Sequence, residues 1–420
     1  MNVSMPYGRS VLDGQIPENV LVKNVNSKKW RALSERQVVK AALERPMGIQ
    51  KLRRVARHRS RVVIVTPDRT RGAPSHITFP LILKELRAAG VDKHSVELLV
   101  ATGLHKGEAS VDLKERFGNE LLEDMQVIVH DSDDQQQLTS LGKLSSGTPL
   151  ILNRALVESD LIVVESTIEP HFFAGFTGGS KMILPGLAGT KTILGNHGWR
   201  NIDDPRSHYG VIENPVRAEA NEALHHLKKI FALNLVSNNR KRIVYANSGE
   251  IMASFTSAAE QVSRHSQIQI AERPDMVITS NGGYPLDRNL YQCIKGIAVP
   301  EEIMHERSRI IMVGECSDGA AHTGFMELLR SGTPSEIYER IRTSGTPACD
   351  QWQVQILCRI LGKNPVWFVT RNELKSEVES AHLHYASTIE EALAAAKLLQ
   401  GERVLLVPEG PAMILKAAAS

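Results

Sequence analysis

The stretch that organises this chain is EPHFFAGFTGGSKMILPGLAG, residues 169–189. It follows an apolar, β-favouring run at residues 161–164, so we expect a buried strand to end where the stretch begins. In parallel α/β sheets, ligands bind beyond the carboxyl ends of the strands. The glycines of the stretch allow positive φ angles or close approach to a ligand. They flank two side chains able to do chemistry, His171 and Lys181. The sequence therefore predicts a ligand-binding loop here.

Strand-like and helical segments alternate on both sides of this loop, which indicates an α/β fold with mainly parallel, doubly wound sheets. Because 420 residues exceed what one hydrophobic core usually supports, we expect two α/β domains, residues 1–268 and 269–420, with an active-site cleft between them. The predicted strands are 62–66, 96–101, 126–130, 161–165, 231–236, 243–246, 276–279, 310–313, 366–370 and 404–407, and the main predicted helices are 77–89, 253–263, 335–342, 352–361 and 389–399.

Composition excludes several classes of protein. A net charge of +3 gives no global field for nucleic acid or a membrane surface. The basic segment 51–61 lacks interleaved aromatic residues, and we interpret it as the solvated face of a helix. The 4 cysteines show no CxxC spacing, which favours reduced thiols and a cytoplasmic location over a zinc site or disulfides. No apolar run reaches the roughly 18 residues that a membrane span requires.

Three histidines, His105, His171 and His197, are predicted in loops that leave the same edge of the first sheet. Two histidines on opposite faces of a substrate carbon can act as a paired acid and base near neutral pH. A third can bind a metal ion through its neutral imidazole. For each histidine taken alone, a structural role with satisfied hydrogen bonds is the alternative.

Lys181 follows two glycines and a serine, but the segment GFTGGSKM does not match the phosphate loop GxxxxGK[ST], because Met182 replaces the hydroxyl residue. This argues against an ordinary NTPase. Three interpretations stay open from the residues alone: a surface lysine, an anion contact, or a nucleophilic lysine desolvated by the neighbouring phenylalanines. Anion contact is the preferred one.

Two further motifs carry polar groups that could reach a cleft. DRTR at residues 68–71 follows the first strand, and its arginines offer a bidentate fork to carboxylate or phosphate. The same residues could instead satisfy the backbone of a turn. In the second domain, YQCIK at residues 291–295 places Tyr291, Gln292 and Lys295 on one side of a helix. They could close the cleft from that side, or form an exposed helix face.

Taken together, these motifs resemble the lactate racemase family, the nickel-pincer nucleotide-dependent racemases and epimerases of 2-hydroxy acids. The resemblance covers most of the chain and is strongest in the first domain. The motifs that carry it are DRTR at 68–71, ATGLH at 101–105, TIEPHFFAGFTGGSKMILPG at 167–186, NH at 196–197 and YQCIK at 291–295.

The resemblance implies an isomerase and a role for each motif. Lys181 is expected to carry, through a covalent bond, the pyridinium-3,5-bisthiocarboxylic acid mononucleotide that holds Ni(II), and His197 to be a nickel ligand. His105 and His171 are expected to be the catalytic acid and base, while the substrate's α-hydride moves reversibly to the cofactor through a bound 2-keto acid. The remaining implied residues are Asp68, Arg69, Thr70 and Arg71 for the cofactor, and Arg71, Tyr291, Gln292 and Lys295 for the substrate.

Other functions and the expected partners complete the sequence-based hypotheses. A nicotinamide-dependent 2-hydroxyacid dehydrogenase is disfavoured because no GxGxxG follows the first strand. A non-catalytic carrier of nickel or of the nucleotide cofactor is the third possibility. The expected partners are a 2-hydroxy acid, lactate-like or larger, together with cofactor-synthesis enzymes and a nickel supply. Neither nucleic acid nor a membrane is expected as a partner.

Overall fold

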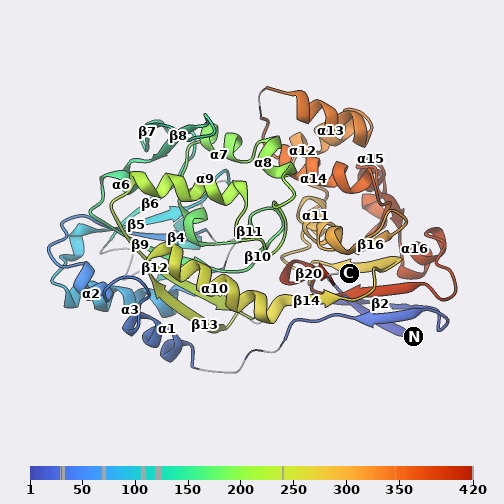
Figure 1. Cartoon of the computed structure of the whole chain (residues 1–420), viewed down its shortest axis with the longest axis horizontal. Coiled ribbons are helices and arrows are strands. Elements are labelled where there is room, and N and C mark those ends of the chain that lie inside the picture. Colours follow the sequence, from blue (N-terminus) through green and yellow to red (C-terminus); the bar gives the residue numbers. More distant parts are fainter. Residues whose placement is uncertain are drawn as a thin grey trace.

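The computed structural model describes residues 1–28, 30, 34–68, 72–105, 110–118, 125–238, 241–345 and 347–418. These residues form two lobes, each built on a six-stranded sheet (Figure 1). In Figure 1 the first lobe, coloured from blue through green to yellow, lies to the left, and the second lobe, mainly orange and red with the blue N-terminal strands beside it, lies to the right. The predicted α/β fold with mainly parallel sheets is confirmed.

The first sheet has the strand order β13-β12-β9-β4-β5-β6. All neighbouring strands are parallel except β12 and β13. The chain order reverses between β4 and β9, and such a reversal is where ligands bind in doubly wound sheets. The strands are β4 (Val62–Pro67), β5 (Val96–Ala101), β6 (Gln126–Val129), β9 (Leu161–Thr167), β12 (Lys229–Ser237) and β13 (Ile243–Gly249).

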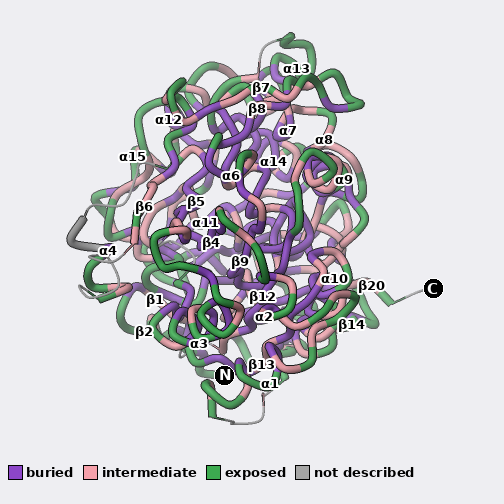
Figure 2. The backbone as a smooth tube through the Cα atoms, turned by 90° about the vertical axis from the view of Figure 1, so that its left-hand side faces the viewer, coloured by how far each residue is buried: buried purple, intermediate pink, exposed green. Residues whose placement is uncertain are grey.

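Helices cover both faces of this sheet. Alternate residues of a strand face opposite sides, so Val62 and Ile64 join one core cluster and Val63 and Val65 join another. Figure 2 shows the tube buried around the labels of β4, β9 and β12. This two-sided burial explains why these strands read as continuous apolar runs. The helices are α1 (Glu35–Glu44), α2 (Leu52–Val55), α3 (Ser75–Ala88), α4 (Ser110–Phe117), α6 (Arg154–Glu158), α7 (Thr190–Asn196), α8 (Trp199–Asp203), α9 (Pro215–Ala223) and α10 (Ile251–Ser266).

The second sheet has the order β18-β17-β16-β15-β19-β3, and every neighbouring pair is parallel. Its edge strand β3 (Leu21–Asn24) comes from the beginning of the sequence, and the hairpin of β1 (Asn2–Tyr7) and β2 (Ser10–Gln15) packs into the same core. The division into residues 1–268 and 269–420 stays a proposal. The other strands are β15 (Met276–Ser280), β16 (Arg309–Val313), β17 (Val366–Val369), β18 (His384–Ala386) and β19 (Arg403–Val407).

The two lobes share a hydrophobic core along their seam. Phe172, Phe173 and Ile202 of the first lobe belong to the same buried cluster as Ile294 and Leu357 of the second. At the lower edge of this seam β14 (Gln267–Ile270) pairs with β20 (Ile414–Ala417) (Figure 1). The helices of the second lobe are α11 (Leu290–Ala298), α12 (Thr323–Arg330), α13 (Pro334–Thr343), α14 (Gln351–Leu361), α15 (Lys375–Ser380) and α16 (Ile389–Ala395).

The basic segment forms less helix than its pattern suggests. Only Leu52–Val55 are helical, as α2, and several of the cations are engaged by carboxylates. Lys51 and Arg53 both contact Glu44, and Arg61 lies 3.6 Å from Glu97. Arg54 and Arg57 of the same segment are exposed, so the segment is in part paired with carboxylates and in part a solvated basic surface. No helix in the described ranges combines the length and the apolar character needed to cross a bilayer.

Candidate active site

The candidate site lies beyond the carboxyl ends of β4, β5 and β9, at the point where the strand order reverses. Asp68 directly follows β4, His105 follows β5, and the loop predicted from residues 169–189 follows β9. Because β4 is paired with both β5 and β9, the three segments leave the sheet side by side. Gly103 N also donates to Gly186 O at 3.0 Å, which joins the His105 loop to the Lys181 loop.

A short hairpin and one tight turn present Lys181. The hairpin pairs β10 (Pro170–His171) with β11 (Gly175–Phe176), and a 3₁₀ turn, η3 (Gly179–Met182), follows. Gly178 and Gly179 have φ angles of 69° and 60°. A Cβ atom on Gly179 would lie 2.6 Å from the ring of Phe255 on α10, so glycine is required here. Lys181 thus lies in a 3₁₀ turn and not at the start of the α-helix that follows a phosphate loop.

Lys181 contacts His171 and an aromatic face. Its Nζ lies 3.3 Å from His171 Nε2 and 5.0 Å from the centroid of the Phe173 ring. His171 is 6% exposed, and its Nδ1 accepts from the backbone N–H of Ala174 at 3.3 Å. These contacts exclude the surface-lysine interpretation. The anion contact and the nucleophile remain open on this geometry.

His197 is buried beside the same aromatic ring. It caps the carboxyl end of α7 and lies edge-on to Phe173 and to Trp352, each with ring centroids 5.0 Å apart. Burial, together with the nearby charge of Lys181, lowers the pKa of His197 to about 3. The imidazole is therefore neutral near pH 7 and can offer a nitrogen lone pair to a metal ion.

His105 is oriented by a carboxylate. Its Nδ1 lies 2.6 Å from Asp68 Oδ2, and Asp68 is buried whereas the His105 side chain is 55% exposed. A carboxylate at Nδ1 accepts the hydrogen of that nitrogen, so Nε2 is left to exchange protons on the solvent side. The predicted residues Arg69, Thr70 and Arg71 lie outside the described residues.

The second lobe contributes α11, whose first turn is capped by Asn289. Lys295 Nζ donates to Gln292 Oε1 at 2.5 Å, so this predicted pair does meet. The Tyr291 hydroxyl donates to Asp350 Oδ1 at 2.9 Å. Burial, with the charge of Asp350 adding to it, raises the pKa of Tyr291 well above its ordinary value. The buried Tyr209 hydroxyl donates to Lys295 O at 2.9 Å and connects α11 to the first lobe.

Sequence reasoning assigned no role to four residues that surround these groups, namely Asn196, Arg217, Glu219 and Trp352, although Asn196 belongs to the quoted NH motif at 196–197. Arg217 on α9 is 1% exposed, and its guanidinium donates to Phe176 O at 2.6 Å and to Gly178 O at 3.3 Å. Burial lowers its pKa to about 9. In the described part of the chain it makes no ion pair with a carboxylate. The only signal in the sequence was an arginine on the otherwise apolar face of a helix.

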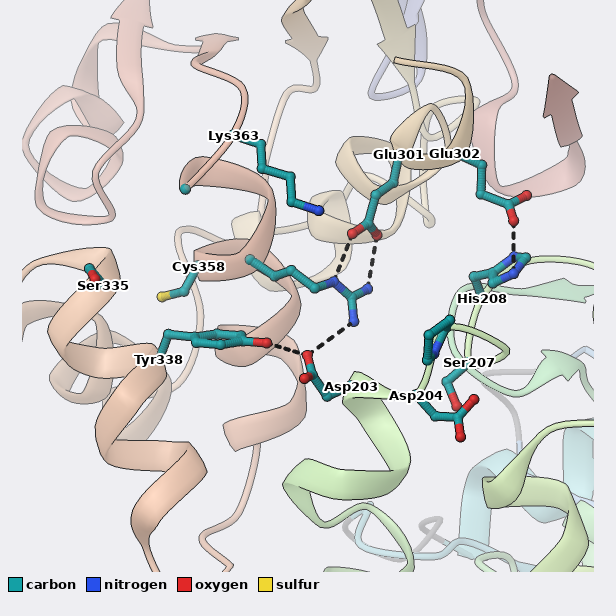
Figure 3. A pocket seen from close by; sticks show the side chains of 13 residues that line it. Asp203, Asp204, Ser207, His208, Glu301, Glu302, Ser335, Tyr338, Cys358 and Lys363 are labelled. Carbon is teal, nitrogen blue, oxygen red and sulfur yellow. Dashed lines mark hydrogen bonds and ion pairs between the residues drawn. The ribbon is translucent and has the colours of Figure 1, made fainter. Parts of the chain in front are cut away.

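A cavity of about 550 Å³ lies elsewhere on the lobe seam (Figure 3). None of the predicted site residues lines it. Several of the polar groups that line it are paired with one another: His208 Nε2 lies 2.8 Å from Glu302 Oε1, and the Tyr338 hydroxyl points at Asp203 and donates to it. Because no predicted site residue lines this cavity, it is not the candidate active site.

Two family models match the chain. The lactate racemase N-terminal domain matches residues 7–210, and the lactate racemase C-terminal domain matches residues 269–415. Two curated proteins named lactate racemase are similar over 99% of this chain and 99% of their own length. The one from Thermoanaerobacterium thermosaccharolyticum is 37% identical, and the one from Lactiplantibacillus plantarum is 33% identical.

Solved structures agree with these matches. The structure of the lactate racemase apoprotein from Thermoanaerobacterium thermosaccharolyticum superposes with a TM-score of 0.93 at 37% identity, over 99% of this chain and 100% of that one. A crystal structure of a Thermotoga maritima protein gives a TM-score of 0.69 at 17% identity, over 92% of this chain and 99% of that one. The second likeness shows the fold alone.

Proposed function

Because the chain belongs to the lactate racemase family, and is therefore an isomerase, we propose that it inverts the configuration at the α-carbon of a small 2-hydroxy acid. Lactate is the first candidate substrate, since both curated relatives are named lactate racemase. The observation that carries the proposal is the grouping of His171, Lys181 and His197 around the ring of Phe173.

The residues present fit the nickel-pincer nucleotide that the family resemblance implies. Lys181 would be its attachment point and His197 a nickel ligand. Two observations support this: His197 is neutral, and the Lys181 amine lies beside an imidazole and an aromatic face. When bound, the group supplies a reversible acceptor for the α-hydride of the substrate. DRTR at 68–71 would hold the mononucleotide part.

His105 and His171 would move the hydroxyl proton of the substrate. Inversion requires that proton to leave when the α-carbon becomes planar and to return when the carbon is tetrahedral again. Asp68 holds His105 by Nδ1, which leaves Nε2 as the proton acceptor. His171 comes from the loop after β9, on the other side of β4 from β5, so the two imidazoles leave the sheet from different strands.

Lys295, Gln292 and Arg71 would hold the substrate carboxylate and oxygen, and Tyr291 would form part of the wall. The Lys295 ammonium supplies the charge that a carboxylate needs, and its hydrogen bond with Gln292 fixes its position. The Tyr291 hydroxyl already donates a hydrogen bond to Asp350, so Tyr291 would contact a substrate through its ring and not through its hydroxyl.

Intact-protein mass spectrometry tests the cofactor proposal. Protein produced with nickel and the cofactor-synthesis enzymes should carry an added mass on Lys181, and Lys181→Ala should carry none. Lys181→Arg is the matched control, because it keeps the positive charge but lacks a nucleophilic amine. Full racemisation by protein without the added mass would overturn the proposal.

Chiral chromatography of lactate and of larger 2-hydroxy acids tests the reaction. His105→Ala and His171→Ala should keep the added mass and lose racemisation. Retained racemisation in either variant would refute the two-base assignment. Net formation of a reduced nicotinamide would indicate the dehydrogenase instead.

A further inference from the structure

A chain of buried hydrogen bonds runs from α9 through Asn196 to His197. Asn196 has no exposed surface, and Glu219 and His197 are 7% and 5% exposed. Asn196 Nδ2 lies 2.8 Å from Glu219 Oε2 and 3.0 Å from Val216 O. Both partners only accept hydrogen bonds, so the amide group of Asn196 must point its NH₂ at them. Its carbonyl oxygen then faces the other way.

That carbonyl oxygen determines which nitrogen of His197 carries hydrogen. Asn196 Oδ1 lies 3.0 Å from His197 Nδ1. A carbonyl oxygen cannot donate, so Nδ1 must carry the hydrogen, and in a neutral ring the lone pair is then on Nε2. Neutral histidine side chains in water favour hydrogen on Nε2, so the protein holds His197 in the less common form.

Further contacts hold both Asn196 and the ring of His197 in place. Its backbone oxygen accepts from Asn201 Nδ2 at 2.9 Å, and the ring of His197 lies between the rings of Phe173 and Trp352. An imidazole that binds a metal through one nitrogen almost always donates from the other, and that second bond sets the ring's tautomer and orientation. Asn196 occupies the place of that second partner.

We propose that Asn196, itself oriented by Glu219, is a positioning residue that fixes His197 with hydrogen on Nδ1 and leaves Nε2 as the metal-binding nitrogen. This inference rests on the proposed function only for the identity of the bound metal. The tautomer itself is a property of the protein without cofactor.

The protein contains its own reference histidine. His130 Nε2 lies 3.0 Å from Ala188 O, which only accepts, and His130 Nδ1 lies 3.1 Å from Asn153 Nδ2. Asn153 Oδ1 is used by Ala155 N at 3.0 Å, so its NH₂ faces the ring. His130 therefore carries hydrogen on Nε2, the tautomer opposite to that of His197, although an asparagine touches Nδ1 of both rings.

Nitrogen NMR of histidine-labelled protein without cofactor, near neutral pH, decides between the tautomers. The signals of His197 are assigned by their loss in His197→Gln. We expect the nitrogen shifts of His197 to show hydrogen on Nδ1, and those of His130 to show hydrogen on Nε2. An Nε2–H pattern for His197 in the wild-type protein would overturn the proposal, and this measurement needs no variant at Asn196 to fold.

Asn196→Leu removes the polar partner and keeps the branching and the number of heavy atoms of the side chain. Asn153→Leu is the matched control at the reference histidine. In Asn196→Leu the NMR signals of His197 should change to those of a ring with hydrogen on Nε2. In protein that carries the added mass on Lys181, the affinity for nickel should fall about 10- to 100-fold. Asn153→Leu should change neither. A folded Asn196→Leu with an unchanged His197 signal and unchanged nickel retention would contradict the positioning role. Absence of the added mass from wild-type protein would instead count against the proposed function and leave the tautomer assignment standing.

Discussion

Two buried arginines hold two different parts of this molecule. Arg217 supports the Lys181 loop with bonds to carbonyl oxygens, lies 3.9 Å above the ring of Phe255, and has its pKa lowered to about 9 by burial. Arg359 on α14 supports the lobe seam, where it binds both oxygens of Glu301 at 2.7 and 2.9 Å and also Ile202 O at 3.0 Å. Although burial opposes its charge, Glu301 and Asp203 raise the pKa of Arg359.

The difference distinguishes the Lys181 loop, which is suited to bind a ligand, from the seam, which holds the two lobes together. At the seam Arg359 meets the carboxylates of Glu301 and Asp203, so its charge is cancelled and the two lobes are held in register. Beneath the Lys181 loop Arg217 donates from its two Nη atoms to carbonyl and hydroxyl oxygens, while its buried Nε has no hydrogen-bond partner among the described residues. Its charge is therefore not cancelled, and these oxygens offset the cost of desolvation only in part. A positive potential is thereby kept close to the loop. Such a potential suits an anionic ligand, as the proposed hydroxy acid and nucleotide would be.

Removing Arg217 should have the largest effect. In Arg217→Met the oxygens of Phe176, Gly178 and Ser180 lose the hydrogen bonds that the guanidinium donates, and we expect the free energy of unfolding to fall by about 2–4 kcal/mol. Urea unfolding followed by circular dichroism measures it. Arg217→Lys keeps the charge without the planar fork and should be intermediate. A loss below about 0.5 kcal/mol would mean that the arginine does not support the loop.

A methyl group on Gly179 should come next. Gly179→Ala places a Cβ 2.6 Å from Phe255 at a φ angle of 60°. We expect the free energy of unfolding to fall by about 2–3 kcal/mol. Gly90→Ala is the matched control, since Gly90 has a φ angle of 81° but no heavy atom within 4 Å of the added Cβ, and it should lose about 1 kcal/mol. Equal losses in the two variants would show that packing against α10 contributes nothing.

Acid should weaken the binding region through His197. Its folded pKa of about 3 lies below the ordinary 6.5, so the unfolded chain binds the proton more readily between these values. The stability contributed by the neutral ring is present above pH 6.5 and is lost as the pH falls toward 3. Between pH 6.5 and 5 we expect the cofactor-free protein to lose roughly 1–2 kcal/mol more than His197→Gln does. Identical pH profiles would contradict burial of the neutral imidazole.

Breaking the seam should have the smallest effect. Arg359 has a side chain 15% exposed, and Arg359 and Glu301 both line the cavity of about 550 Å³, so water can solvate the carboxylate that Arg359→Met leaves behind. We expect a loss of about 1–2 kcal/mol in urea unfolding, with the His197 tautomer and the added mass on Lys181 unchanged. A changed tautomer would show that the seam and the binding region are one unit.

The sequence predicted the sheets well because their strands are buried on both faces. Residues 62–65 and 161–164 are apolar throughout, and such runs can be recognised as strands without knowing which strands they pair with. The sequence did not predict β3. Its four residues are short of a recognisable pattern and partly exposed, and nothing in them specifies the partner strand β19 far along the chain. The loop at residues 169–189 could be recognised from its glycines, because positions with positive φ angles favour glycine and so enrich the sequence in it.

The supporting residues could not be found in this way. Asn196 and Glu219 differ from any other polar residues on helices only in what they touch, and those contacts depend on how α7 and α9 pack together. Arg217 was a visible anomaly on an apolar helix face, but the sequence does not say which carbonyl oxygens it reaches. The roles of His105, His171, Lys181 and His197 stay proposals until the cofactor and the reaction are measured.

The pairing of β3 with β19 sets an order on the assembly of the molecule during synthesis. All strands of the first sheet lie between Val62 and Gly249, so that lobe has every strand it needs while much of the second lobe is still unmade. Strand β3 must wait for its partner until Arg403–Val407 have been made, whereas Val3 and Met5 of the hairpin share a core with Ile278 and Ile311 of the earlier strands β15 and β16. The sheet of the second lobe is therefore completed only after all strands of the first sheet are available.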